Sequence, residues 1–527
     1  MRLLGWPLAL AAVAGGAQAL ALADPWRGQP RGWLQVASLA ILVAALLHGS
    51  RAAPARRLLR HAALLGWTYA LTWLAGTFWW LYVSMYTYGG LPAPLAAVAV
   101  FLLAASLALA YAAACAGFVA LAVRWPRRPV VQALLFAAAW TLAELARGRW
   151  LTGFPWGAGG YAHASGWLAG YAPWVGVYGI GFLAALAAAA LAGGLARHTR
   201  PGARTAALLL AVAVPVLGAW VPRLAPLPDQ AAGPPMDVAL LQGNIAQDEK
   251  FIPGTGVADA LQWYGEQLQA SDASLTVTPE TAIPLLPSQL PAGYLQQLQQ
   301  HFSQRGLAAL LGIPLGSFEA GYTNSVIGAG PEPAPAYRYD KHHLVPFGEF
   351  IPPLFRWFTN LMNIPLGDFN RGPLVQPSLS WRGQRLAPNI CYEDLFGEEL
   401  AARFADAARA PTVLVNMSNI GWFGDTIAID QHLQISRMRA LEFARPVLRA
   451  TNTGATAIID HRGDVTGLLP SFTRGVLRGT FEGRTQVTPY AFWAARFGLL
   501  PLWLGCLLLL LGGAAVISLN RRAAAPG

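Results

Sequence analysis

The sequence predicts a polytopic α-helical membrane domain joined to an external α/β domain. The 527-residue chain is 55% apolar and only 12% charged, which is too apolar a balance for a soluble protein. Residues 225 to 490 depart from this pattern, because short β-rich runs there alternate with amphipathic segments at helical spacing. Such alternation is typical of an α/β domain.

Eight apolar runs are close to or longer than the roughly 17–25 residues that a membrane-spanning helix needs. They lie at 3–23, 33–49, 62–84, 93–123, 129–147, 172–196, 204–221 and 494–518. The first run ends in Ala-Leu-Ala-Asp, so it also resembles a cleaved signal peptide, and its removal would leave seven helices. We expect it to be retained, which gives eight spans.

The arginines predict how these helices are oriented. They cluster in the loops at 51–60, 124–128 and 197–204, which are alternate connections, and in the tail at 521–522. By the positive-inside rule these segments and both termini are cytoplasmic, and the long segment between spans seven and eight is external. The net charge of +11 therefore reflects membrane topology, and we assign no nucleic-acid role.

We therefore predict transmembrane helices one to seven in 1–222, the external domain in 223–490, and the eighth helix with a cytoplasmic tail in 491–527. The loop from 148 to 167 is rich in Trp, Tyr and Gly, which indicates an interfacial or re-entrant segment. It is either an ordinary aromatic belt or the lipid-side floor of a site. Near it, Glu144 is expected to pair with Arg147, three residues further along the same helix.

In the external domain, three polar residues stand at strand ends or in the turns that follow. We expect strands at 236–244, 274–280, 306–316, 385–391, 410–419 and 455–461, and helices at 257–271 and 430–446. Glu280 lies in TVTPETAIP, Lys341 in YRYDKHHLVPFGEF and Cys391 in APNICYEDLFG. They are 61 and 50 residues apart, which excludes a local motif but suits strand ends that converge on one edge of a sheet.

Cys391 is expected to be a free thiol, because Cys115 and Cys506 lie inside apolar runs. An isolated cysteine is more simply a small buried apolar residue, but its acidic neighbours and the two upstream motifs favour a nucleophile. A carboxylate can take the thiol proton, and an ammonium can stabilise the thiolate and the oxyanion, with the backbone N–H of Tyr392 as a second donor. The set predicts acyl transfer through a thioester.

Lysine is rare in this chain. Lys250 and Lys341 are the only lysines among 37 basic residues, which suggests that each position needs a compact ammonium able to lose its proton. His342 and His343 are adjacent, so their side chains diverge on a strand, and we expect no metal site.

PETAIP, KHHLVPFGEF and NICYEDLFG resemble the three signatures of the nitrilase superfamily, whose sites are Glu-Lys-Cys on an α-β-β-α sandwich. Further motifs narrow the resemblance: QGNIAQ, LTGFPWG, NMSNIGWFGD and RPVLRATNTGATAIID, in this context of membrane helices, resemble the bacterial apolipoprotein N-acyltransferase family. The similarity covers essentially the whole chain.

The resemblance implies roles for single residues. Glu280 corresponds to the general base, Lys341 to the oxyanion stabiliser and Cys391 to the acyl-accepting nucleophile. Glu349, in PFGEF, corresponds to a glutamate that orients the lysine and the substrate amine, and it also suits a structural ion pair with Lys341.

Tyr392 and Glu393 match family positions beside the nucleophile, and Glu393 is expected to hold a loop or to hydrogen-bond the site. This chain departs from the family at two places. Phe251 stands where a tryptophan is common, which keeps an apolar platform for substrate without the indole N–H. Ile420 and Gly421 stand where an Asp-Ala pair commonly precedes the Trp-Phe-Gly turn.

The resemblance also implies a two-step reaction without a cofactor. Cys391 takes an acyl chain from a phospholipid, phosphatidylethanolamine in the family, and the α-amine of an apolipoprotein's N-terminal diacylglyceryl-cysteine then accepts it. The implied location is the bacterial inner membrane, with the catalytic domain on the periplasmic side and the enzyme a monomer. The loop near 345–370 is apolar enough to dip into the bilayer or to gate the site through Phe355, Trp357 and Phe358.

Two other functions stay open at this point. The first is a membrane-tethered amidase or nitrile hydrolase, in which water is the second acceptor. The second is a catalytically silent scaffold that binds lipoproteins. The membrane helices favour a lipid-anchored acceptor over the first, and the intact Glu280, Lys341 and Cys391 argue against the second.

Overall fold

The computed structural model describes residues 5–48, 54–196, 199–317, 319–331, 336–352 and 369–523. The chain divides into two compact units. One comprises Met1–Leu81, Ala93–Pro226 and Leu499–Gly527, and the other comprises Tyr82–Pro92 and Leu227–Gly498. The predicted gating residues Phe355, Trp357 and Phe358 lie outside the described part of the chain.

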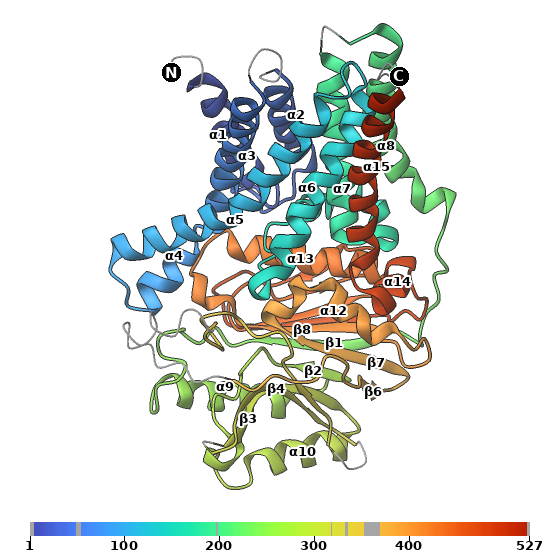
Figure 1. Cartoon of the computed structure of the whole chain (residues 1–527). Coiled ribbons are helices and arrows are strands. Elements are labelled where there is room, and N and C mark those ends of the chain that lie inside the picture. The colour runs from blue at the N-terminus through green and yellow to red at the C-terminus, as the bar shows by residue number, and fades with distance from the viewer. Residues whose placement is uncertain are drawn as a thin grey trace. The chain divides into compact units, whose positions relative to one another are not determined.

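The first unit is helical, and each of the eight predicted apolar runs overlaps one of its helices (Figure 1). These helices are α1 (Gly5–Ala19), α2 (Gly32–His48), α3 (Ala55–Thr77), α5 (Ala93–Ala122), α6 (Pro129–Arg149), α7 (Ala172–Leu195), α8 (Pro201–Leu224) and α15 (Leu500–Ala523).

Four of the described helices, α5 to α8, are long and apolar enough to cross a membrane. A fifth span results if α14 (Pro489–Phe497) and α15, which are bent against each other, count as one. The structure thus supports several spans but not the predicted number of eight. Within the described residues, α1 comprises 15 residues and α2 comprises 17, whereas a span usually needs about 20.

Glu144 and Arg147 attract each other electrostatically, as predicted, and both also bond to the loop that follows α6. Glu144 Oε1 accepts the backbone N–H of Gly159 at 2.9 Å. Arg147 donates to the carbonyls of Phe154 at 2.6 Å and Trp156 at 2.7 Å. Because a folded-back loop leaves backbone groups without helical partners, these two side chains satisfy them inside the unit.

The second unit contains two six-stranded sheets (Figure 1). The first has the order β12 (Gly475–Phe481), β1 (Met236–Gln242), β2 (Leu275–Val277), β3 (Ala308–Ser317), β4 (Gly321–Ala329) and β5 (Arg338–Asp340). The second has the order β11 (Val465–Leu468), β10 (Ala457–Ile459), β9 (Val447–Thr451), β8 (Val413–Ser418), β7 (Gln384–Ile390) and β6 (Leu379–Trp381). In each, three central strands are parallel, namely β1-β2-β3 and β7-β8-β9.

The two sheets pack face to face between helices. Val238, Leu275 and Leu310 of the first sheet share one apolar core with Ile390 and Val415 of the second. The other face of the first sheet packs against α9 (Gly256–Ala270) and α10 (Tyr294–Arg305), and α13 (Ala428–Phe443) covers the second sheet (Figure 1). This layering is the predicted α-β-β-α sandwich.

Every strand and helix predicted for this unit overlaps an observed one. The prediction gave no range for β5, the strand before Lys341, and missed β4, β6, β9, β11, β12, α10 and α12 (Gly397–Ala401). Among these, β4 and β5 matter most, because they extend the first sheet and bring Asn324 and Lys341 to its edge.

Candidate active site

The ends of three strands bring the predicted acid, lysine and cysteine together. Glu280 follows β2, Lys341 directly follows β5 and Cys391 directly follows β7. The Lys341 ammonium lies 3.3 Å from Glu280 Oε1. Lys341 is 1% exposed and Glu280 is 8% exposed, so water screens this pair little. Cys391 is partly buried and is a free thiol.

A second carboxylate and an amide complete the charged cluster. Lys341 Nζ donates to Glu349 Oε1 at 2.9 Å. Asn324, in the middle of β4, donates through Nδ2 to both Glu280 Oε1 at 2.7 Å and Glu349 Oε1 at 2.8 Å. The two donors, the Lys341 ammonium and the Asn324 amide, therefore each bridge the two carboxylates. Although burial opposes the charge, the two carboxylates raise the pKa of Lys341 above its usual value, so it carries a full positive charge at neutral pH.

The end of β8 links the carboxylate to the thiol. Glu280 Oε2 accepts the backbone N–H of Asn419 at 2.9 Å, and the same N–H also faces the Cys391 thiol beside the Ser418 hydroxyl. Burial and the negative charge of Glu280 raise the pKa of the thiol to about 12, against the opposing effect of Lys341. The resting thiol is therefore protonated at neutral pH, and its reaction requires a base.

Cys391 occupies a strained turn. Its φ is 51°, in the left-handed region that residues with a Cβ seldom adopt, where β7 gives way to a 3₁₀ turn. Strain of this kind costs about 1–3 kcal/mol and persists only where the surroundings hold it. Asn416 of β8 donates to the Cys391 carbonyl at 3.4 Å, and the neutral His432 ring on α13 also bonds to the Cys391 backbone.

Arg449 of β9 holds these supports in turn. Its buried guanidinium donates to Asn416 Oδ1 at 2.9 Å and to Ser436 Oγ at 2.8 Å, and it lies 2.9 Å from His432 Nδ1. Its charge is balanced by the buried Asp394, 3.8 Å away and hydrogen-bonded to Ser436. The Cys391 turn thus rests on a buried polar network that α13, β8 and β9 share.

Glu393 ties the Lys341 loop to the Cys391 turn. Its Oε2 accepts the Ile390 N–H at 2.6 Å and the Tyr339 hydroxyl at 2.8 Å. Its Oε1 accepts the backbone N–H groups of His342 at 2.6 Å and His343 at 3.2 Å. With four donors on its two oxygens, Glu393 has the bonds of a loop anchor.

The two remaining predicted site residues, Tyr392 and Phe251, differ in exposure. Tyr392 is buried, with its ring 5.3 Å from that of Phe396 in an edge-on contact. Phe251 is 52% exposed, and the Lys250 ammonium lies over its ring, 5.7 Å from the ring centroid. The neighbouring Lys250 is buried and donates to the Glu280 carbonyl oxygen at 3.0 Å. Burial lowers the pKa of Lys250 to about 8.

The sequence argument named Glu280, Lys341, Glu349, Cys391 and Glu393 but assigned no role to Asn324, Asn416, Asn419 or Arg449. Asn419 belongs to NMSNIGWFGD and Arg449 to RPVLRATNTGATAIID, so those motifs carried a signal. Asn324 lies in an unremarkable strand, and only the pairing of β4 with β3 and β5 brings it to the site.

Two family models match the chain. Residues 14–190 match the apolipoprotein N-acyltransferase N-terminal domain, and residues 237–490 match the carbon-nitrogen hydrolase domain. An amidase structure from Nesterenkonia sp. aligns with 51% of this chain and 95% of its own, at 18% identity and a TM-score of 0.35.

Curated relatives match almost the full length. The chain is 59% identical to an apolipoprotein N-acyltransferase of Verminephrobacter eiseniae over 94% of both chains. It is 46% identical to an apolipoprotein N-acyltransferase of Ralstonia nicotianae over 94% of this chain and 90% of that one. On this full-length similarity, the chain belongs to the apolipoprotein N-acyltransferase family.

Proposed function

We propose that this enzyme transfers an acyl chain from a phospholipid, phosphatidylethanolamine, to the α-amine of the N-terminal diacylglyceryl-cysteine of an apolipoprotein. The observation that supports this proposal most is that Glu280 contacts the Lys341 ammonium and shares a backbone N–H donor with the Cys391 thiol. One carboxylate oxygen lies 3.3 Å from the Lys341 ammonium, and the other accepts the Asn419 N–H that also faces the Cys391 thiol.

In the first half-reaction, Glu280 takes the thiol proton as Cys391 attacks the ester carbonyl of the phospholipid. The need for this base follows from the thiol pKa of about 12. The negative charge that develops on the carbonyl oxygen is stabilised by Lys341 and by the backbone N–H of Tyr392. The C–O bond then breaks, the leaving alkoxide takes the proton from Glu280, and a lysophospholipid departs from a Cys391 thioester.

In the second half-reaction, the neutral α-amine of the acceptor attacks the thioester carbonyl and gives a proton to Glu280. The C–S bond breaks, the Cys391 thiolate regains that proton, and an amide forms. Glu349 keeps the Lys341 ammonium in place through its 2.9 Å bond and keeps it charged throughout. No cofactor is needed.

Lipid-anchored substrates explain why an active site of this kind is attached to membrane helices. We propose eight spans, with residues 223–490 on the periplasmic side of the inner membrane and the enzyme acting as a monomer. The four to five helices that are clearly long and apolar enough support this, and the alternating arginine loops support the orientation.

The test is acylation of a synthetic diacylglyceryl-cysteine peptide by the full-length enzyme in phosphatidylethanolamine vesicles. We expect the peptide to gain one fatty-acyl mass on its α-amine, and we expect Cys391→Ala to abolish the gain. Cys506→Ala is the matched control and should retain activity, because Cys506 lies within α15. Acylation by the Cys391→Ala variant, or release of free fatty acid without peptide acylation, would contradict the proposal.

A further inference from the structure

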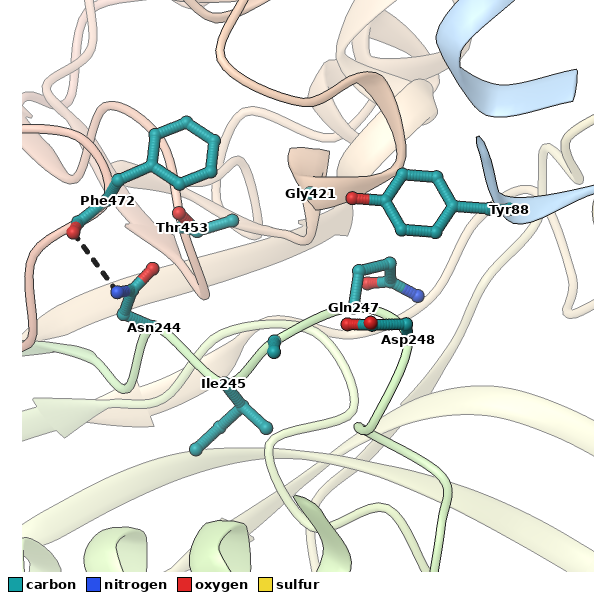
Figure 2. A pocket seen from close by; sticks show the side chains of 9 residues that line it. Tyr88, Asn244, Ile245, Gln247, Asp248, Gly421, Thr453 and Phe472 are labelled. Atoms are coloured by element: carbon teal, nitrogen blue, oxygen red, sulfur yellow. Dashed lines mark hydrogen bonds between the residues drawn. The ribbon is translucent and has the colours of Figure 1, made fainter. Parts of the chain in front are cut away.

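A small cavity of about 230 Å³ lies in the second unit, beside the loop that joins β1 to α9. Figure 2 shows Tyr88 and Phe472 on opposite sides of it, with Asn244, Gln247 and Asp248 along another edge. Phe472 and Asn244 both have left-handed backbones, with φ of 55° and 48°, and are joined by a hydrogen bond of 3.1 Å from Asn244 Nδ2 to the Phe472 carbonyl. One wall of the cavity thus consists of two turns with strained backbones that a hydrogen bond joins.

Two lining side chains are buried and hold polar atoms without a partner. The Gln247 side chain is 8% exposed, and its Nε2 makes no hydrogen bond. Thr453 is 4% exposed, and its Oγ1 also makes none. A buried donor left unpaired costs about 1–3 kcal/mol, so both atoms are suited to bond a ligand that enters the cavity.

The cavity is joined to the catalytic cluster through one residue. Gln247 Oε1 accepts the Asn419 Nδ2 amide at 2.7 Å, and the Asn419 backbone N–H binds Glu280 Oε2. A ligand that hydrogen-bonds Gln247 is therefore connected to the proposed general base, Glu280, through the two hydrogen bonds of Asn419.

Size and charge decide which part of a substrate fits. The volume is below the roughly 300–1,000 Å³ of pockets for drug-sized ligands, so a short polar segment fits and a long acyl chain does not. The only charged residue among the described residues that line it is the acidic Asp248, which disfavours a lipid phosphate. Neutral amide groups match the free amide of Gln247 and the free hydroxyl of Thr453.

Gly421 sets the width of the cavity. A Cβ at this position would lie 3.1 Å from Thr453 Cγ2 and 3.4 Å from Gln247 Oε1, so it would crowd the side chains that carry the two unpaired atoms. The departure from an Asp-Ala pair at 420–421 therefore leaves space where a side chain would otherwise stand.

We propose that this cavity binds the peptide backbone that directly follows the acylated cysteine of the acceptor. The inference rests on the proposed function and adds a specificity site to it. The Thr453 hydroxyl and the Gln247 amide bond the carbonyl groups of this segment, and the segment's position orients the α-amine toward the Cys391 thioester.

The experiment compares two acceptors with the full-length enzyme in phosphatidylethanolamine vesicles. One is a diacylglyceryl-cysteine tetrapeptide, and the other is diacylglyceryl-cysteine methyl ester, which carries the same α-amine and no further residue. Thr453→Val replaces the hydroxyl with a methyl group of similar size, and Gly421→Ala narrows the cavity. Thr466→Val, on β11 and outside the cavity, is the matched control.

We expect kcat/KM of the wild type to favour the tetrapeptide, and Thr453→Val and Gly421→Ala each to lower the tetrapeptide-to-ester ratio about tenfold, or about 1.4 kcal/mol. The ratio should stay at the wild-type value in Thr466→Val. The amount of Cys391 acyl-enzyme formed before the acceptor is added reports the folded, active fraction of each variant.

An unchanged tetrapeptide-to-ester ratio of kcat/KM in both variants would overturn the inference. A selective loss in the rate of acyl-enzyme formation would also overturn it, because it would assign the cavity to the phospholipid headgroup. Absence of acyl transfer to either acceptor in the wild type would instead refute the proposed function. The two failures are therefore distinguishable.

Discussion

Replacing Arg449 with methionine tests how the Cys391 turn is held. Arg449 is fully buried, and its guanidinium bonds Asn416, Ser436, His432 and the Ala455 carbonyl. Methionine fills similar space but removes the charge and all these donors. The buried Asp394 is then left without its cation.

The expected loss follows from that uncompensated charge. Removing one partner of a buried ion pair costs about 3–5 kcal/mol of unfolding free energy. Burial already raises the pKa of Asp394, and Arg449 opposes this rise, so loss of Arg449 raises that pKa further. A carboxyl whose folded-state pKa is raised binds more protons when folded, so stability falls as pH rises. The difference from wild type should therefore shrink between pH 7 and pH 5.

The assay is a denaturant titration of the detergent-solubilised enzyme at both pH values, with the rate of acyl-enzyme formation measured in parallel. The double variant Arg449→Met with Asp394→Asn should regain much of the stability at pH 7, because it buries no charge. It should still form the acyl-enzyme at least about tenfold more slowly, because Asn416 and His432 have lost their anchor. A single variant as stable as wild type, a penalty that does not depend on pH, or a wild-type rate in the double variant would refute the reasoning.

Other predictions concern the buried ionisable groups. Burial lowers the pKa of Lys250 to about 8, so the folded state loses this proton before the unfolded state does. The stability of wild type relative to Lys250→Met, measured by denaturant titration, should therefore rise from pH 8 to pH 10. A stability difference that does not change over this range would show that Lys250 is not buried as a cation. The raised thiol pKa of about 12 has the opposite effect on stability, because the folded thiol keeps its proton when the unfolded thiol has lost it. Stability relative to Cys391→Ser should therefore fall above about pH 8.5. Iodoacetamide should label Cys391 faster with each pH unit up to pH 10, and a labelling rate that levels off near pH 7 would contradict this. Glu393→Gln replaces one carboxylate oxygen with an amide NH2 group, which leaves two of the four donors facing it, and should cost about 2–3 kcal/mol of unfolding free energy. Tyr339→Phe removes one bond and should cost about 1 kcal/mol in the same titration; equal costs would argue against the anchor role.

The sequence predicted the layers of the second unit well because its central strands are buried on both faces. Leu240 and Leu241, for example, are neighbours on β1 that pack into different cores, so the strand is a continuous apolar run. Strand ends followed by Glu280 and Cys391 were visible for the same reason. β4 and the edge strand β5 are mixed in polarity and partly exposed, and their pairing was not predictable from periodicity.

The residues that hydrogen-bond the predicted catalytic side chains and their turns could not be identified from their spacing in the sequence. Asn324, Asn419 and Arg449 act through partners 25 to 139 residues away, and only the folded sheets bring these side chains together. The helix prediction has a different limit. Apolar runs located the helices of the first unit, but composition did not separate the four or five described helices that are long and apolar enough to span a membrane from the others.

The most direct test of covalent catalysis by Cys391 is the intact mass of the purified enzyme after incubation with phosphatidylethanolamine and no acceptor. The wild type should gain one fatty-acyl mass, and Cys391→Ala should gain none. A diacylglyceryl-cysteine peptide should discharge the adduct quickly, and water should do so slowly. Absence of the adduct, its persistence in Cys391→Ala, or discharge by water as fast as by the peptide would contradict a thioester that serves N-acylation.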